Sequence, residues 1–157
     1  MHELKYGGWQ GLAEPMATRM ARSTWPDDVV LERNALVPVP LAGVRERERG
    51  FNQSARLAHA LSHHWCVQVW DDVLVRTRAT MTQTRLTPEQ RRGNVSGAFR
   101  AVAGTRARLR NSHVVLVDDV VTTGATLVEC ALALLDGGAR IVSFVTFGRA
   151  PASGDRR

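Results

Sequence analysis

The chain has 157 residues, which is the size of one domain that can bury a hydrophobic core. Apolar residues make up 44% of it, which excludes a disordered protein, and no apolar run is long enough to span a membrane. The net charge of +6 is carried almost entirely by arginine, and it reflects either the codon usage of a GC-rich genome or a partner rich in phosphate.

Helices and strands are expected to alternate along the chain. In chain order, hydrophobic spacing and turn residues predict a helix over 9–21, a break at 25–28, a strand over 34–39, a charged loop over 41–50, a helix over 52–65, a strand within 67–75, a long polar loop over 76–97, a short strand over 98–103, a strand over 114–117, a helix over 125–135 and a strand over 141–147. This alternation indicates an α/β fold with a mainly parallel, twisted sheet flanked by helices. We expect a single domain over 1–150 and a polar tail over 151–157.

The sequence has no export signal, and it has no pattern of cysteines that would bind zinc. The first 15 residues lack the apolar core of a signal peptide, so a cytoplasmic location is expected, with no membrane partner. Cys66 and Cys130 stand far apart, which excludes a zinc ribbon built from CxxC pairs, and we expect both to be small buried apolar residues.

The strongest functional signal follows the strand over 114–117. Asp118 and Asp119 come at the end of this strand, where two carboxylates can accept hydrogen bonds from a ribose diol. The turn that opens the next helix consists of Thr122, Thr123, Gly124, Ala125 and Thr126. Its first amides have no partner within the helix, so they attract a phosphate, and the glycine allows a close approach. The alternative is an ordinary capped helix preceded by two solvated acids.

This segment resembles the motif of type I phosphoribosyltransferases that binds 5-phosphoribosyl 1-pyrophosphate (PRPP). The resemblance implies the type I phosphoribosyltransferase fold, with an N-terminal hood, here residues 1–28, and a flexible loop. It also implies that Asp118 and Asp119 are catalytic and hold the ribose hydroxyls, and that residues 122–126 hold the 5-phosphate.

Two further loops make the chain similar to the ComF family, which is associated with DNA uptake in competent bacteria. The matching residues are the run 37–41, Arg45, the run 49–53, Arg76, Arg78, Thr80, Gln83, Leu86, Arg91, Asn94, Val95 and the run 97–99. The resemblance implies that Arg45 and Arg49 bind the pyrophosphate of PRPP. It places Arg78, Thr80, Gln83 and Arg91 in the flexible loop that closes over it.

The same resemblance implies a cofactor and leaves the acceptor open. Magnesium is expected with PRPP, held by the ligand itself and in part by Asp118 and Asp119. ComF proteins commonly carry an N-terminal zinc ribbon, which is expected to be missing here in a short form or a truncated gene product, so no zinc is expected. Neither a general base nor a base-reading pattern stands out, and the five histidines are expected on the surface or in structural positions.

Three functions follow as alternatives. The first is transfer of the phosphoribosyl group from PRPP to a nitrogen acceptor with release of pyrophosphate. The second is binding of PRPP or a phosphoribosyl nucleotide without catalysis, together with competence proteins. The third is binding of single-stranded DNA through arginines and tryptophans, although Trp65 and Trp70 lie in apolar contexts that favour core packing. A homodimer is compatible with all three.

Overall fold

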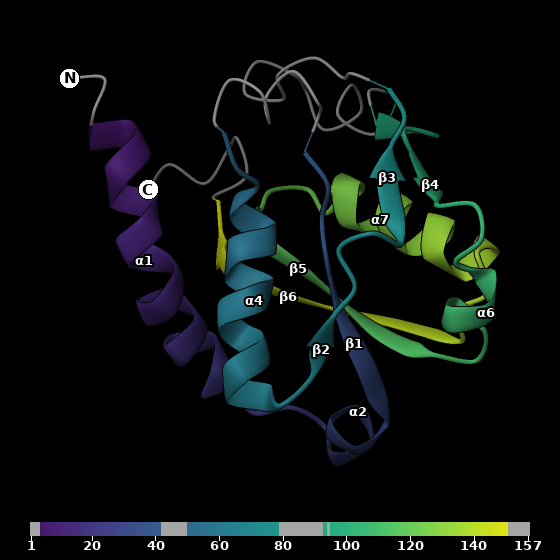
Figure 1. Ribbon diagram of the computed structural model, residues 1–157, viewed down its shortest axis with the longest axis horizontal. Helices are drawn as coiled ribbons and strands as arrows, with labels where there is room; N and C mark the ends of the chain where they lie inside the picture. Colours follow the sequence, from purple (N-terminus) through teal and green to yellow (C-terminus); the bar gives the residue numbers. More distant parts are fainter. Residues whose placement is uncertain (1–3, 42–49, 79–92, 94, 151–157) are drawn as a thin grey trace.

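The computed structural model describes residues 4–41, 50–78, 93 and 95–150, with the side chains of 4–10 left out (Figure 1). The elements are α1 (Leu4–Ala21), α2 (Asp27–Glu32), β1 (Arg33–Pro38), α4 (Gln53–Trp65), β2 (Gln68–Val69), β3 (Leu74–Arg76), β4 (Phe99–Ala101), α6 (Arg106–Leu109), β5 (His113–Val121), α7 (Ala125–Asp136) and β6 (Ile141–Arg149).

Four strands form one parallel sheet in the order β2-β1-β5-β6, and β3 and β4 form a separate antiparallel pair. In the centre of the sheet, Leu36 of β1 lies opposite Val115 of β5. The α/β fold with a mainly parallel sheet, as expected from the sequence, is therefore confirmed. Because the strands are parallel, the carboxyl ends of β1, β5 and β6 lie at one edge of the sheet.

The central strands bury both of their faces. In β5, Val114 and Leu116 belong to one hydrophobic cluster, while Val115 and Val117 belong to the cluster on the opposite face. All four are at most 1% exposed. This two-sided burial explains why the sequence of this strand is a continuous apolar run rather than an alternating one.

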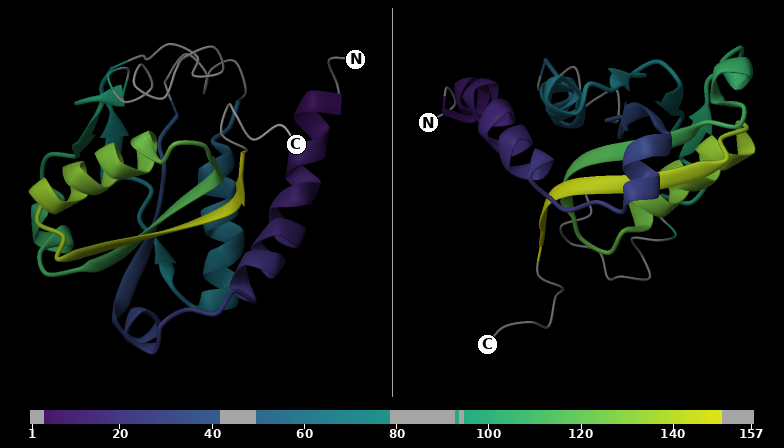
Figure 2. Two further views of the ribbon diagram at one scale, coloured as in Figure 1. Left: turned by 180° about the vertical axis from the view of Figure 1, so that it is seen from behind. Right: turned by 90° about the horizontal axis from the view of Figure 1, so that it is seen from below.

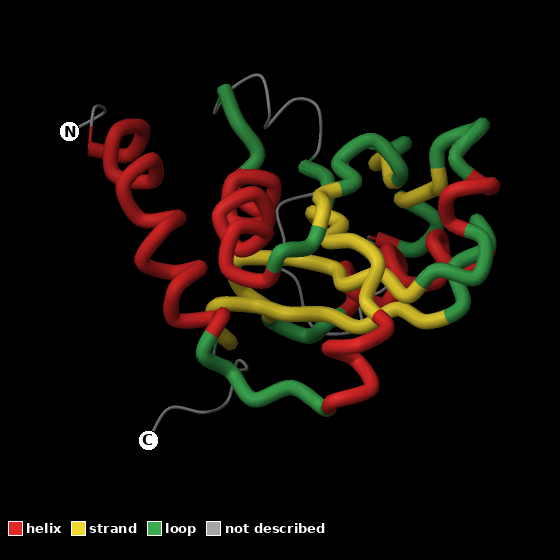
Figure 3. Tube along the Cα trace, turned by 60° about the horizontal axis from the view of Figure 1, so that its bottom comes forward, coloured by secondary structure: helices red, strands yellow, loops and turns green. Residues whose placement is uncertain are grey.

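The two clusters separate the helices into two layers. Helices α1 and α4 cover one face of the sheet, and α7 covers the other (Figures 2 and 3). The antiparallel pair β3–β4 packs beside α7, where Leu74 and Phe99 share a cluster with Leu127 and Leu134. Helix α7 ends before Gly137 and Gly138, at the stop that the sequence predicts.

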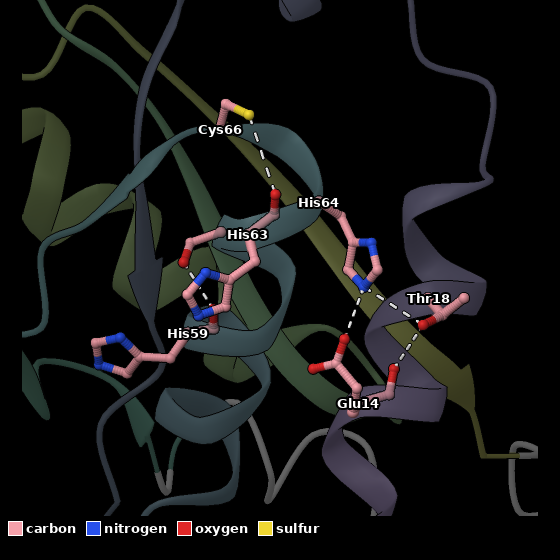
Figure 4. Close-up of polar contacts among 7 residues, drawn as sticks. Glu14, Thr18, His59, His63, His64 and Cys66 are labelled. Atoms are coloured by element: carbon pink, nitrogen blue, oxygen red, sulfur yellow. Dashed lines mark hydrogen bonds and ion pairs between the residues drawn. The ribbon is translucent and has the colours of Figure 1, made fainter.

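Helix α1 includes much of the predicted hood and contributes to the core. Ala13, Ala17 and Met20 are buried in the cluster that contains α4. His64 of α4 points toward α1 and lies 3.1 Å from the Glu14 carboxylate, with Thr18 beside it (Figure 4). The role of residues 1–28 as a hood stays a prediction.

Trp65 and Trp70 pack against the two hydrophobic clusters. Trp70 is 7% exposed and lies in the core, as expected. Trp65 packs partly buried against its cluster, with its ring 5.1 Å from that of Trp25 and under the guanidinium of Arg33. Among the histidines, His113 is buried and its Nε2 lies 2.8 Å from Ser143 Oγ.

Several local expectations differ from the structure. Helix α2 begins within the break predicted at 25–28, α6 was not foreseen, and the strand expected within 67–75 is two short strands, β2 and β3, in different sheets. Strand β5 continues four residues beyond the predicted end, because β6 extends to Arg149 and pairs with it. Cys66 is exposed, which contradicts the expected burial: it occupies the left-handed position that ends α4 (φ 52°), outside the core that takes up Cys130.

Among the helices of the described residues, none combines the length and apolar character that crossing a bilayer requires. The cytoplasmic location stays a prediction.

Gly137 provides a test of the packing between α7, β4 and α6. A Cβ added there would lie 2.6 Å from Ala101 Cβ and 3.0 Å from Leu109 Cδ1, whereas one added at Gly11 in α1 meets nothing within 4 Å. We expect Gly137→Ala to lower the free energy of unfolding by about 1–3 kcal/mol through overpacking. Gly11→Ala should raise it by about 0.5–1 kcal/mol through helix propensity. Urea unfolding of both variants checks this, and an equal change in the free energy of unfolding would contradict the close packing of Gly137 against Ala101 and Leu109.

Candidate functional site

The acidic pair lies inside strand β5 rather than in a loop after it. Asp118 pairs in register with Thr146 of β6, and both acids are partly buried. Asp118 Oδ1 accepts two hydrogen bonds, from Ser54 Oγ at 2.8 Å and from the amide of Asp119 at 3.0 Å. The Asp119 carboxylate accepts from the amide of Val120 at 2.7 Å. The two carboxyl groups are thus held by short hydrogen bonds at the carboxyl end of the sheet.

The environment of Asp118 disfavours its charge. Burial, followed by the neighbouring Asp119 carboxylate, raises the pKa of Asp118 from 3.8 to about 7. The hydrogen bond from Ser54 acts in the opposite direction, because it stabilises the ionised form. Carboxyl groups whose pKa is raised by burial and by a neighbouring acid are frequent in functional sites, and a bound cation would favour the ionised form of Asp118.

The turn between β5 and α7 has the geometry of a phosphate cradle. Gly124 adopts φ 78°, a left-handed conformation that glycine tolerates best, and a Cβ placed there would meet nothing within 4 Å. The first helical bond runs from the amide of Val128 to the carbonyl of Gly124 at 2.9 Å. The amide of Ala125 reaches only the Thr123 hydroxyl, at 3.5 Å. The start of α7 therefore presents amide groups and a partial positive charge to open space.

A pocket of about 110 Å³ joins the acidic pair to this turn. Its lining residues are Asp118, Val120, Val121, Thr122, Gly124, Ala125, Thr126 and Leu127. Of the predicted site residues in β5 and the turn, five therefore line one hollow, while Asp119 and Thr123 lie beside it in the chain. A larger hollow of about 420 Å³ lies at the other end of α7, near Gly104 and Asp136, and contains none of the predicted residues.

The remaining predicted site residues fall mainly outside the described part of the chain. Arg45, Arg49, Thr80, Gln83 and Arg91 lie there. Arg78 is described: its guanidinium donates to the carbonyl of Ser96 at 2.8 Å. The amide of Gly97 donates to Glu129 of α7 at 2.7 Å. These two contacts join the ends of the predicted flexible loop to each other and to the helix that follows the turn.

One residue at the site was not foreseen from the sequence. Ser54 was not among the predicted site residues. The only hint in the sequence was its position two residues after Asn52, at the start of the helix that follows the loop after β1. Asn52 caps α4, because its side chain accepts from the amide of Ser54 at 3.0 Å. It also donates to the carbonyl of Val39 at 3.0 Å. Phe51, the residue before Asn52, is partly buried and lies 4.5 Å beneath the guanidinium of Arg56.

The pKa of Asp118 implies a pH-dependent stability. The unfolded carboxyl ionises near 3.8 and the folded one near 7, so unfolding releases a proton between these values and the fold loses stability as the pH rises through this window. Asn cannot ionise, and each pKa unit corresponds to about 1.4 kcal/mol. We expect Asp118→Asn to raise the free energy of unfolding by about 1–3 kcal/mol at pH 8, with little gain at pH 4. Denaturant unfolding at both pH values checks this, and a gain independent of pH would contradict it.

Comparison with known proteins identifies the family. Residues 12–157 match the family described as phosphoribosyl transferase domain. The DNA utilization protein YhgH of Salmonella typhi is 36% identical over 151 residues, which cover 90% of this chain and 62% of that protein. Competence protein ComFC of Bacillus subtilis is 35% identical over 107 residues, which cover 66% of this chain and 39% of that protein. Competence protein F of Haemophilus influenzae is 38% identical over 95 residues, which cover 60% of this chain and 41% of that protein.

Among solved structures, the glutamine PRPP amidotransferase of Bacillus subtilis in complex with ADP and GMP aligns with a TM-score of 0.56 at 18% identity, over 86% of this chain and 26% of that chain. At this identity the likeness is one of fold. The family match extends over nearly the whole chain, and the relatives carry competence and DNA utilization names. The chain therefore belongs to the phosphoribosyl transferase domain family, with the type I fold and the ComF-type relatives that its sequence motifs indicated.

Proposed function

We propose that this chain binds PRPP with magnesium at the pocket between β5 and α7 and transfers its phosphoribosyl group to a nitrogen acceptor. One observation carries the proposal: a carboxyl with a raised pKa and the amide-lined start of a helix face the same small pocket. A sugar phosphate with a diol at one end and a phosphate at the other has complementary chemistry. The association with DNA utilization and competence rests on the names of the relatives.

In this proposal each part of the ligand has its own partners. Asp118 and Asp119 accept hydrogen bonds from the ribose hydroxyls, and residues 122–126 donate to the 5-phosphate. Arg45 and Arg49 bind the pyrophosphate, and Arg78, Thr80, Gln83 and Arg91 contribute to the loop that closes over the ligand. Closure would keep water away from a sugar that hydrolyses wastefully.

Magnesium fits this arrangement as an ion bound chiefly by its ligand. The described residues contain no group of three or more His, Cys, Asp or Glu side chains that could hold a metal by themselves. Asp118 and Asp119 still offer the hard oxygen donors that magnesium prefers, and oxygens of PRPP and water would complete the shell. When bound, the ion would neutralise charge on the departing pyrophosphate.

The transfer itself requires little covalent chemistry from the protein. The acceptor nitrogen forms a bond to the anomeric carbon while the bond from that carbon to the pyrophosphate oxygen breaks. Positive charge develops on the sugar ring as these bonds change, and in this proposal the two carboxylates stabilise it. The acceptor's proton leaves to solvent or to a base on the acceptor side of the site.

A second candidate function is binding of single-stranded DNA, for which a different surface provides support. A hollow of about 380 Å³ between the end of α1 and β6 is lined by Arg19, Arg22 and Phe147, and the phenylalanine is 43% exposed. Arginine and an exposed aromatic ring are the groups that bind phosphates and stack on bases. The packing of Trp65 and Trp70 against the core reduces the support that the tryptophans gave to this alternative.

Calorimetric titration of magnesium and PRPP into three proteins tests the proposal. The wild type should bind, and Asp118→Asn/Asp119→Asn should lose binding at least tenfold, about 1.4 kcal/mol, because the amides cannot attract the diol and the ion as carboxylates do. The matched control is Asp27→Asn/Asp28→Asn, an adjacent acidic pair in α2 at the opposite edge of the sheet, which should bind like the wild type.

The competing outcome has its own signature. A folded wild type that does not bind PRPP contradicts the proposal. Binding of a single-stranded oligonucleotide whose affinity falls with salt, at a slope of roughly 0.7 for each neutralised phosphate, would then favour the DNA-binding alternative.

A further inference from the structure

The first turn of α4 connects the acidic pair to the neighbouring strand through hydrogen bonds. Ser54 Oγ donates to Asp118 Oδ1 at 2.8 Å, and the amide of Ser54 donates to the side chain of Asn52 at 3.0 Å. Asn52 in turn donates to the carbonyl of Val39 at 3.0 Å. The amide of Val39 donates to the carbonyl of Val117, the residue before Asp118, also at 3.0 Å. The contacts close into a ring that starts and ends at Asp118.

The groups in this ring of hydrogen bonds have little access to water that could replace a lost partner. Ser54 is 4% exposed, so its hydroxyl has little access to water and loses free energy if its partner is removed. Val39 is 6% exposed and is bonded through both its amide and its carbonyl. Asp118 is bonded at the same Oδ1 by Ser54 and by the amide of Asp119. Two donors that converge on one oxygen fix the plane of the carboxyl group.

We propose that Ser54 is a positioning residue that fixes the orientation of the Asp118 carboxyl group toward the ribose of the ligand. This inference rests on the proposed binding of PRPP and assigns a role to a residue outside the acidic pair and the phosphate turn. With the hydroxyl in place, Oδ1 is held by the protein and the carboxyl presents a defined face to a diol. Without it, the carboxyl keeps only its contact with the adjacent amide and can rotate.

A structural role for Ser54, limited to the start of α4, makes a different prediction. A purely structural change at the start of α4 would either leave ligand binding by the folded protein unchanged or weaken ligands with and without the diol alike. Loss of carboxyl orientation would weaken only ligands that carry the ribose diol. Inorganic pyrophosphate with magnesium lacks the diol, so it separates the two roles.

The experiment measures the binding of magnesium PRPP and of magnesium pyrophosphate to Ser54→Ala by calorimetry. We expect about a tenfold weaker affinity for PRPP, about 1.4 kcal/mol, and an affinity for pyrophosphate within about twofold of the wild type. Ser62→Ala is the matched control: it removes a hydroxyl from the same helix, one that donates to the carbonyl of His59. It should leave both affinities unchanged.

The outcomes of these titrations distinguish the positioning role of Ser54 from the proposed binding of PRPP. Unchanged PRPP affinity in Ser54→Ala, or an equal loss for both ligands, overturns the positioning role while leaving the proposed function standing if the wild type binds PRPP. A wild type that binds no PRPP overturns both. If Ser54→Ala does not fold, Ser54→Thr and Ser54→Val replace it as a pair that differs only in the hydroxyl. Tighter PRPP binding by the threonine variant supports the role, and equal binding overturns it.

Discussion

The parallel pairing of β1 with β5 is the constraint on which the site depends. Both strands are buried on both faces, so their register is fixed by two hydrophobic clusters at once. The pairing continues one residue past β1, where the amide of Val39 bonds to Val117. This brings Val39, the start of α4 and the acidic residues of β5 to one edge of the sheet. The starts of α4 and α7 lie next to Asp118 because each helix begins close to the carboxyl end of a strand of this sheet.

The site imposes a local cost on the fold. A pair of adjacent carboxyl groups, partly buried, is unfavourable in the absence of a ligand, and the raised pKa of Asp118 expresses that cost. The left-handed conformation of Gly124 adds little to this cost, because glycine accepts a positive φ readily. The acidic pair is tolerated because the strands and helices around it are packed into two hydrophobic clusters. Unfavourable local arrangements held by a well-packed frame are typical of binding sites.

Much of this arrangement could be predicted from the sequence, and the exceptions have a common cause. The strand over 114–117 and the helix over 52–65 follow from local patterns, and the structure places β5 and α4 over these residues. The bond between Ser54 and Asp118 joins residues 64 apart, which no local pattern reveals. The extension of β5 depends on how far β6 runs alongside it. Cys66 was misjudged because its exposure follows from the left-handed end of α4, not from its own polarity.

The position of the acidic pair within a strand, instead of a loop, has an energetic consequence for binding. Asp118 and Val120 are in register with Thr146 and Gly148, so the backbone beneath the carboxyl groups is already ordered by the ladder. A loop would have to lose conformational entropy when a ligand arrived, and this loss would be subtracted from the affinity. Here that entropy has been lost during folding. The preorganisation is only as firm as the carboxyl end of β6, because β6 is the edge strand of the sheet and supports β5 from one side.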